Sequence, residues 1–141
     1  MKKKRKKIEW FDKKNFIVNI DVFDTQVGVY VNYTYGEMVK HIKKIAKKDY
    51  YDKFIETYGE KCEIEEQVNG QMYKMGGGFI LILRSGDRGF RYFINTVVHE
   101  VTHITHYLCR NRRISLTEDS EEIYCYLVGF LTEQILRKLY K

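Results

Sequence analysis

Apolar positions recur with different periods along the 141-residue chain, and each change of period marks a predicted element. Residues 16–33 are rich in Val, Ile, Phe and Tyr and are broken near residues 24–28, which predicts a hairpin of two strands. Thr34 and Glu37 have the spacing of a capping box, and apolar residues then recur at helical intervals. An amphipathic helix is therefore expected over residues 35–48.

Three later segments also show helical spacing. A short helix is expected from Asp49, as its cap, to Tyr58, with Gly59 as its stop. A longer pattern covers about residues 91–109, and a third covers residues 123–139. The third is apolar over most of its circumference, so we expect it to pack deep in the domain.

Two strand signals separate these helices. Alternation over residues 62–68, the turn pair Asn69-Gly70 and the segment 71–75 predict a second hairpin. The apolar run at residues 79–83 predicts a short strand, which is either core or a place where an extended peptide adds as a further strand. Strands and helices in this order predict an α+β fold.

Composition is that of one folded domain, with 44% apolar and 15% aromatic residues. No run of 18 uncharged apolar residues occurs, so no contact with a membrane is expected. The chain also lacks an apolar stretch of signal-peptide length at its start, which predicts a cytoplasmic location.

The net charge of +6 is concentrated at one end. Residues 2–7 read Lys-Lys-Lys-Arg-Lys-Lys, so the remainder carries 19 basic and 19 acidic residues. We therefore expect a solvated basic tail over residues 1–14 and a single domain over residues 15–141. Binding of nucleic acid through Lys2–Lys7 is the alternative.

The three cysteines are Cys62, Cys109 and Cys125. Their odd number and wide spacing argue against a disulfide framework, and the absence of a CxxC pair argues against a thiolate zinc site. A reducing compartment is expected.

The helical segment predicted at about residues 91–109 contains the HExxH motif at His99, Glu100 and His103. Residues four apart lie on one helix face, so both imidazoles can hold one zinc ion. Glu100 lies at the flank of this face, where its carboxylate can act as a general base on water without ligating the metal. The opposite face is apolar and is predicted to be buried, with Val97, Val101, Ile104 and Leu108.

A catalytic zinc site needs a third protein ligand, which we expect at the start of the last helix. Glu122 is preferred to Glu121 because Cys125 and Gly129 on its side are small, which would let the two helices approach closely. Glu121 is the alternative. His106 shares the histidine face and is the other alternative ligand, but it lies about 10 Å along the axis from His99. This distance favours a role in contacting a metal ligand or the substrate, or as a wall of the cleft.

The HExxH helix together with residues 116–129 resembles the small zincin-like metallopeptidases encoded by tailed bacteriophages. The resemblance covers residues 79–139, and Ile123 and Cys125 replace alanines of the family pattern. It implies a minimal zincin-like fold, in which a small sheet packs on the active-site helix and a long C-terminal helix. It also implies gluzincin-type ligation of one zinc by two histidines and one glutamate.

Taken together, motif and resemblance predict a zinc metallopeptidase acting on a protein or peptide in the host cytoplasm. Two alternatives are a structural or virion-associated phage protein that keeps the fold and metal without proteolysis, and a DNA-associated protease directed by its basic tail.

Overall fold

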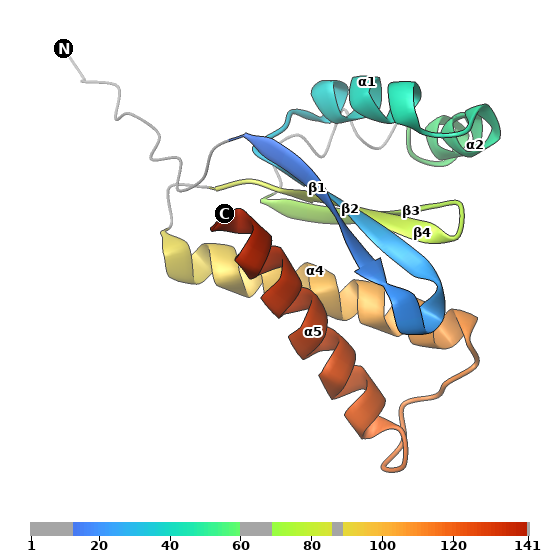
Figure 1. The fold of residues 1–141 in the computed structure, drawn as a ribbon, viewed down its shortest axis with the longest axis vertical. Helices are drawn as coiled ribbons and strands as arrows, with labels where there is room; N and C mark the ends of the chain where they lie inside the picture. Colours follow the sequence, from blue (N-terminus) through green and yellow to red (C-terminus); the bar gives the residue numbers. More distant parts are fainter. Residues whose placement is uncertain (1–12, 60–68, 86–88, 141) are drawn as a thin grey trace.

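The computed structural model describes residues 13–59, 69–85 and 89–140, and it has an α+β fold (Figure 1). Four strands form one sheet in the order β1-β2-β4-β3. Their bounds are β1 Lys14–Ile20, β2 Thr25–Val31, β3 Gly70–Met75 and β4 Gly78–Leu83. The predicted α+β class is confirmed.

Four α-helices cover the two faces of this sheet. In Figure 1, α1 and α2 lie over one face, and α4 and α5 lie over the other. The helices are α1 Tyr35–Ile45, α2 Lys48–Tyr58, α4 Phe90–Asn111 and α5 Glu121–Leu139, and a 3-10 turn, η1, covers Asp21–Phe23. No helix in these described ranges is long and apolar enough to cross a membrane.

Alternation along the strands separates two apolar cores. In β2, Val27, Val29 and Val31 belong to the core that α4 and α5 cover, whereas Tyr30 points to the other face. There, Met38 and Ile42 of α1 and Phe54 of α2 close the second core over Tyr30, Tyr73, Ile80 and Ile82.

The pairing of the strands decides which edges are free. β4 pairs in parallel with β2 and antiparallel with β3, so both of its edges are occupied. The suggestion that a peptide adds at residues 79–83 is therefore wrong. Within the part of the chain that the structure describes, β1 and β3 are the two outer strands of the sheet.

The first half of the chain follows its sequence signals closely. β1 and β2 form the predicted antiparallel hairpin, although the break lies at η1 and Thr25 already belongs to β2. The capping box of Thr34 and Glu37 is present. The helix it starts ends at Ile45 because Ala46 is extended.

Two expectations about turns and caps are wrong. The residue before α2 is Lys47, and Asp49 lies inside the first turn of that helix. Gly70 is the first residue of β3, paired with Leu83, so it is not a turn residue. The strand predicted at residues 62–68 lies outside the described residues.

Both long helices form where the sequence predicted them. α4 extends the expected segment by one or two residues at each end. Residues 117–120 form a turn in which the Ser120 hydroxyl contacts the backbone and side chain of Thr117, and α5 follows.

Candidate metal centre

The HExxH helix, α4, is sharply two-sided. Its predicted apolar face is confirmed, since all four side chains are at most 3% exposed: Val97, Val101, Ile104 and Leu108. His99, His103 and His106 are exposed on the other side. This division follows from helical periodicity and leaves the histidines open to a ligand.

The imidazole rings of His99 and His103 approach each other through their Nε2 atoms. Their Nε2 atoms are 3.2 Å apart, and the ring planes make an angle of 78°. Two nitrogens each about 2.0–2.1 Å from a tetrahedral zinc ion are separated by about 3.3 Å. The same approach also permits a hydrogen bond from one ring to the other. The separation of the two nitrogens therefore matches that of two imidazole ligands on one zinc ion.

Glu100 is buried beside this pair. Its side chain is 8% exposed, and its Oε1 lies 3.9 Å from Nε2 of His99. A Cβ added at Gly70 would stand 3.2 Å from Cγ of Glu100 and 2.5 Å from Cγ2 of Thr96. Strand β3 thus passes directly over the helix at Glu100, and the missing side chain of Gly70 makes this approach possible.

A small hollow of about 280 Å³ opens next to Glu100 on the β3 side of the helix. Its polar character comes from side chains one and two turns before His99. The residues that line it are Asn69, Gly70, Tyr92, Asn95, Thr96, His99 and Glu100. The sequence analysis did not identify this hollow. Helical phase alone would have placed Tyr92, Asn95 and Thr96 near the histidine face, but the position of Gly70 depends on sheet pairing.

On the other flank, α5 packs against the end of the histidine face. The ring of Tyr124 lies 5.2 Å from that of His106, and its hydroxyl donates to the carbonyl oxygen of Ile114 at 2.6 Å. Burial raises the pKa of both Cys109 and Tyr124. The exposed ring of His106 therefore packs against Tyr124 of α5.

Glu122 and Glu121 are both exposed in the first turn of α5. Glu122 lines an apolar hollow with η1, on the β1 side of the helix. Glu121 lies about 60° around the helix from Tyr124, which faces α4, whereas Glu122 lies about 160° away. Among the described residues, no group of three His, Cys, Asp or Glu side chains is close enough to hold a metal ion.

The reason given for preferring Glu122 is not supported by the packing. Cys125 and Gly129 are exposed, and a Cβ added at Gly129 would have no atom within 4 Å. This side of α5 therefore does not pack closely against α4, contrary to expectation. Cys109 is buried and, like Cys125, is a free thiol, while Cys62 lies outside the described residues.

Comparison of the chain with family models, with curated proteins and with solved structures finds no match. Function is therefore inferred from the geometry of α4 and its neighbours.

Proposed function

We propose that this chain is a zinc-dependent peptidase built on a minimal zincin-like domain. The observation that carries the proposal is the convergence of His99 and His103, with Nε2 atoms 3.2 Å apart, beside the buried carboxylate of Glu100. Two neutral imidazoles that ligate the ion, with a carboxylate beside them that does not, are the arrangement of a hydrolytic zinc centre on one helix.

The third ligand is proposed to be a carboxylate from the first turn of α5. The resemblance at the sequence level favours Glu122, and helical phase in the structure favours Glu121, which lies on the side of α5 nearer to α4. Either carboxylate would give two nitrogens and one oxygen on zinc and leave a fourth position for water or substrate.

Zinc bound here supplies a Lewis acid that acidifies water and polarises the scissile carbonyl. Glu100 accepts the proton of the attacking water and later donates it to the leaving amine. Its burial under Gly70 limits the positions that the carboxylate can take, which keeps it beside His99.

The substrate is proposed to lie along β3, since β4 has no free edge. The backbone N–H of Met72 lies on the side of β3 away from β4, where it can pair with an extended peptide, while the Met72 carbonyl oxygen accepts from Nε2 of Gln71 at 3.3 Å. Such a peptide would run past the polar hollow beside His99 and Glu100, which can take one side chain of the substrate.

A peptide library made from a bacterial proteome and read by mass spectrometry tests this activity. The zinc-loaded protein should produce a set of new peptide ends that is absent with Glu100→Gln and absent after chelation. Identical peptide profiles for the parent and Glu100→Gln would contradict the proposal, because cleavage would then not depend on the proposed base.

A further inference from the structure

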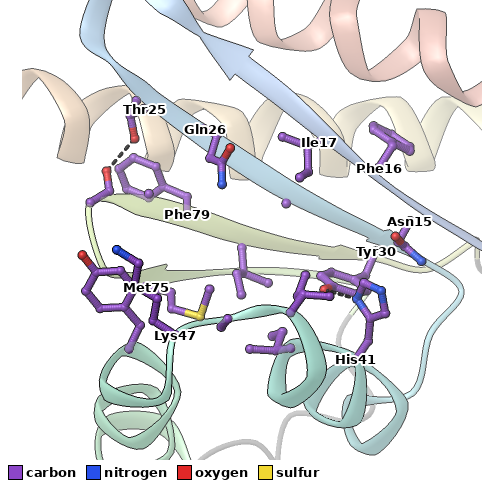
Figure 2. Close-up of a pocket in the computed structure, with 18 of the residues that line it drawn as sticks. Asn15, Phe16, Ile17, Thr25, Gln26, Tyr30, His41, Lys47, Met75 and Phe79 are labelled. Atoms are coloured by element: carbon purple, nitrogen blue, oxygen red, sulfur yellow. Dashed lines mark hydrogen bonds between the residues drawn. The ribbon is translucent and has the colours of Figure 1, made fainter.

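A second hollow lies on the opposite face of the sheet from the metal centre, between α1 and the hairpin of β1 and β2 (Figure 2). Its volume is about 410 Å³, which is within the usual range of small-molecule sites. The hollow is independent of the proposed zinc chemistry, because the sheet separates it from α4 (Figure 1).

The hollow exists because β2 has a glycine at its floor. Gly28 points to the face of the sheet that carries Tyr30, but it has no side chain to fill the space under α1. A Cβ added there would meet Cε2 of Tyr30 at 3.8 Å and the carbonyl oxygen of Phe79 at 3.9 Å. Both are ordinary contact distances, so the backbone tolerates a side chain at this position.

The walls of the hollow carry exposed apolar side chains that belong to neither core. Ile17 of β1 is 44% exposed, Ile45 at the end of α1 is 60% exposed and Tyr50 of α2 is 43% exposed. All three line the hollow. Apolar side chains gathered around one concavity typically mark a place where an apolar ligand binds.

Polar groups stand at one end of the hollow. The hydroxyl of Tyr30 lies 2.7 Å from Nδ1 of His41, and Nδ2 of Asn15 donates to the hydroxyl of Tyr33 at 2.7 Å. Figure 2 shows Asn15, Tyr30 and His41 together at this end, with Lys47 at the other. The hollow is thus long, with an apolar middle and hydrogen-bonding groups near its ends.

Two side chains of opposite charge line the hollow. Four further lysines between Glu37 and Asp49 do not line it: Lys40, Lys43, Lys44 and Lys48. Lys47 lines the hollow itself. Asp24 is the carboxylate among the lining residues, at the end of η1. Lys47 favours an anionic group at its end of the hollow, and Asp24 opposes it.

We propose that this hollow binds a small amphipathic anion, with its apolar body over Gly28 and its anionic group near Lys47. The ligand class is an organic carboxylate or sulfonate that carries an aromatic or aliphatic body. The apolar walls supply most of the affinity through burial, and the lysine selects the charge.

The probe that matches this chemistry is anilinonaphthalene sulfonate, whose fluorescence rises on binding to apolar sites. Its uncharged analogue N-phenylnaphthylamine has the same ring system without the sulfonate. The parent protein should bind the sulfonate at one site per chain and should bind the neutral analogue at least about threefold more weakly.

Three substitutions and one control test the position of the probe. Gly28→Leu fills the floor and should weaken binding about tenfold or more. Lys47→Gln should weaken it about two- to fivefold, while Lys43→Gln, the same charge change outside the hollow, should leave it nearly unchanged. Asp24→Asn should strengthen binding, and Asn tolerates the backbone of this position, where φ is 49°.

Unchanged sulfonate binding by folded Gly28→Leu would overturn the proposal, because the probe would then sit elsewhere. If Gly28→Leu does not fold, Lys47→Gln and Asp24→Asn still decide. Only a site at this hollow would bind the sulfonate more weakly in Lys47→Gln and more strongly in Asp24→Asn. Equal binding of the neutral analogue would overturn the choice of an anion.

Discussion

Gly70 lies so close to Glu100 that a Cβ at position 70 would stand 3.2 Å from Cγ of the glutamate. The two residues are far apart in the chain and are joined by the packing of β3 on α4. This approach keeps Glu100 buried and fixes it beside His99. The position of the proposed base therefore depends on a glycine in a neighbouring strand.

Substitution of Gly70 by Ala should lower peptidase activity at least about tenfold while zinc remains bound, because the methyl group displaces Glu100 and not the histidines. The added Cβ also meets Cγ2 of Thr96 at 2.5 Å. Thr96→Ser removes that methyl and keeps a hydroxyl that can donate to Tyr92, so the double variant should recover part of the activity. Gly129→Ala, where no atom lies within 4 Å of the new Cβ, is the matched control. Full activity in Gly70→Ala would show that Glu100 is not held by this contact.

Glu100→Gln should reduce kcat about 10²- to 10⁴-fold and leave the zinc content unchanged, since the amide is nearly isosteric but cannot accept the proton. Activity and metal content of the same preparation are the two readouts. Glu133→Gln is the control because Glu133 is exposed and pairs with Arg137 on the surface. Loss of zinc from Glu100→Gln would instead make Glu100 a ligand.

One glutamate of the first turn of α5 should contribute to zinc affinity. The phase of the helix predicts that Glu121→Ala weakens zinc binding more than Glu122→Ala, by at least about tenfold, because Glu121 lies nearer to the side that faces α4. Competition with a zinc chelator of known affinity measures both variants. A larger loss with Glu122→Ala would support the ligand chosen from the sequence, and parent-like affinity in both would exclude this turn as the source.

Ionisation of Tyr30 should lower the free energy of unfolding at alkaline pH. Burial, followed by repulsion from Tyr33, raises the pKa of Tyr30 from 10.0 to about 12. The folded state therefore holds this proton longer than the unfolded state, and the stabilisation is fully present below about pH 10 and is lost as the pH rises toward 12. The free energy of unfolding should fall by up to about 1.4 kcal/mol per pH unit in this window.

Urea unfolding at about pH 9 and about pH 11.5 measures the effect. Tyr30→Phe removes the titrating hydroxyl and should flatten the fall, although the lost hydrogen bond to His41 should cost about 1 kcal/mol at neutral pH. Tyr126→Phe, at an exposed tyrosine, serves as the control. The same slope in Tyr30→Phe and the parent would contradict the assignment.

Local signals in the sequence predicted local structure well. The capping box at Thr34, the hairpin of β1 and β2 and the apolar face of α4 depend on neighbours along the chain, so their patterns were sufficient. The pairing of His99 and His103 follows for the same reason, since both residues lie on one helix.

Long-range contacts could not be predicted in this way. Gly70 has the dipeptide signal of a turn, but its pairing with Leu83 places it in a strand. The choice between Glu121 and Glu122 depends on the rotation of α5, which is fixed by burial of Tyr124, Leu127 and Leu131 against the core. The hollow above Gly28 requires α1 to cross the sheet near Ile80, a relation that no periodicity within one segment contains.

The most direct test of the proposed metal centre is zinc content, measured by inductively coupled plasma mass spectrometry on the untagged protein after equilibration with zinc. The parent and His106→Ala should hold one zinc ion per chain, and His99→Ala and His103→Ala should each lose it, because only the first two retain the converging Nε2 pair. A parent that binds no zinc, or a His103→Ala variant that binds as much as the parent, would contradict the account.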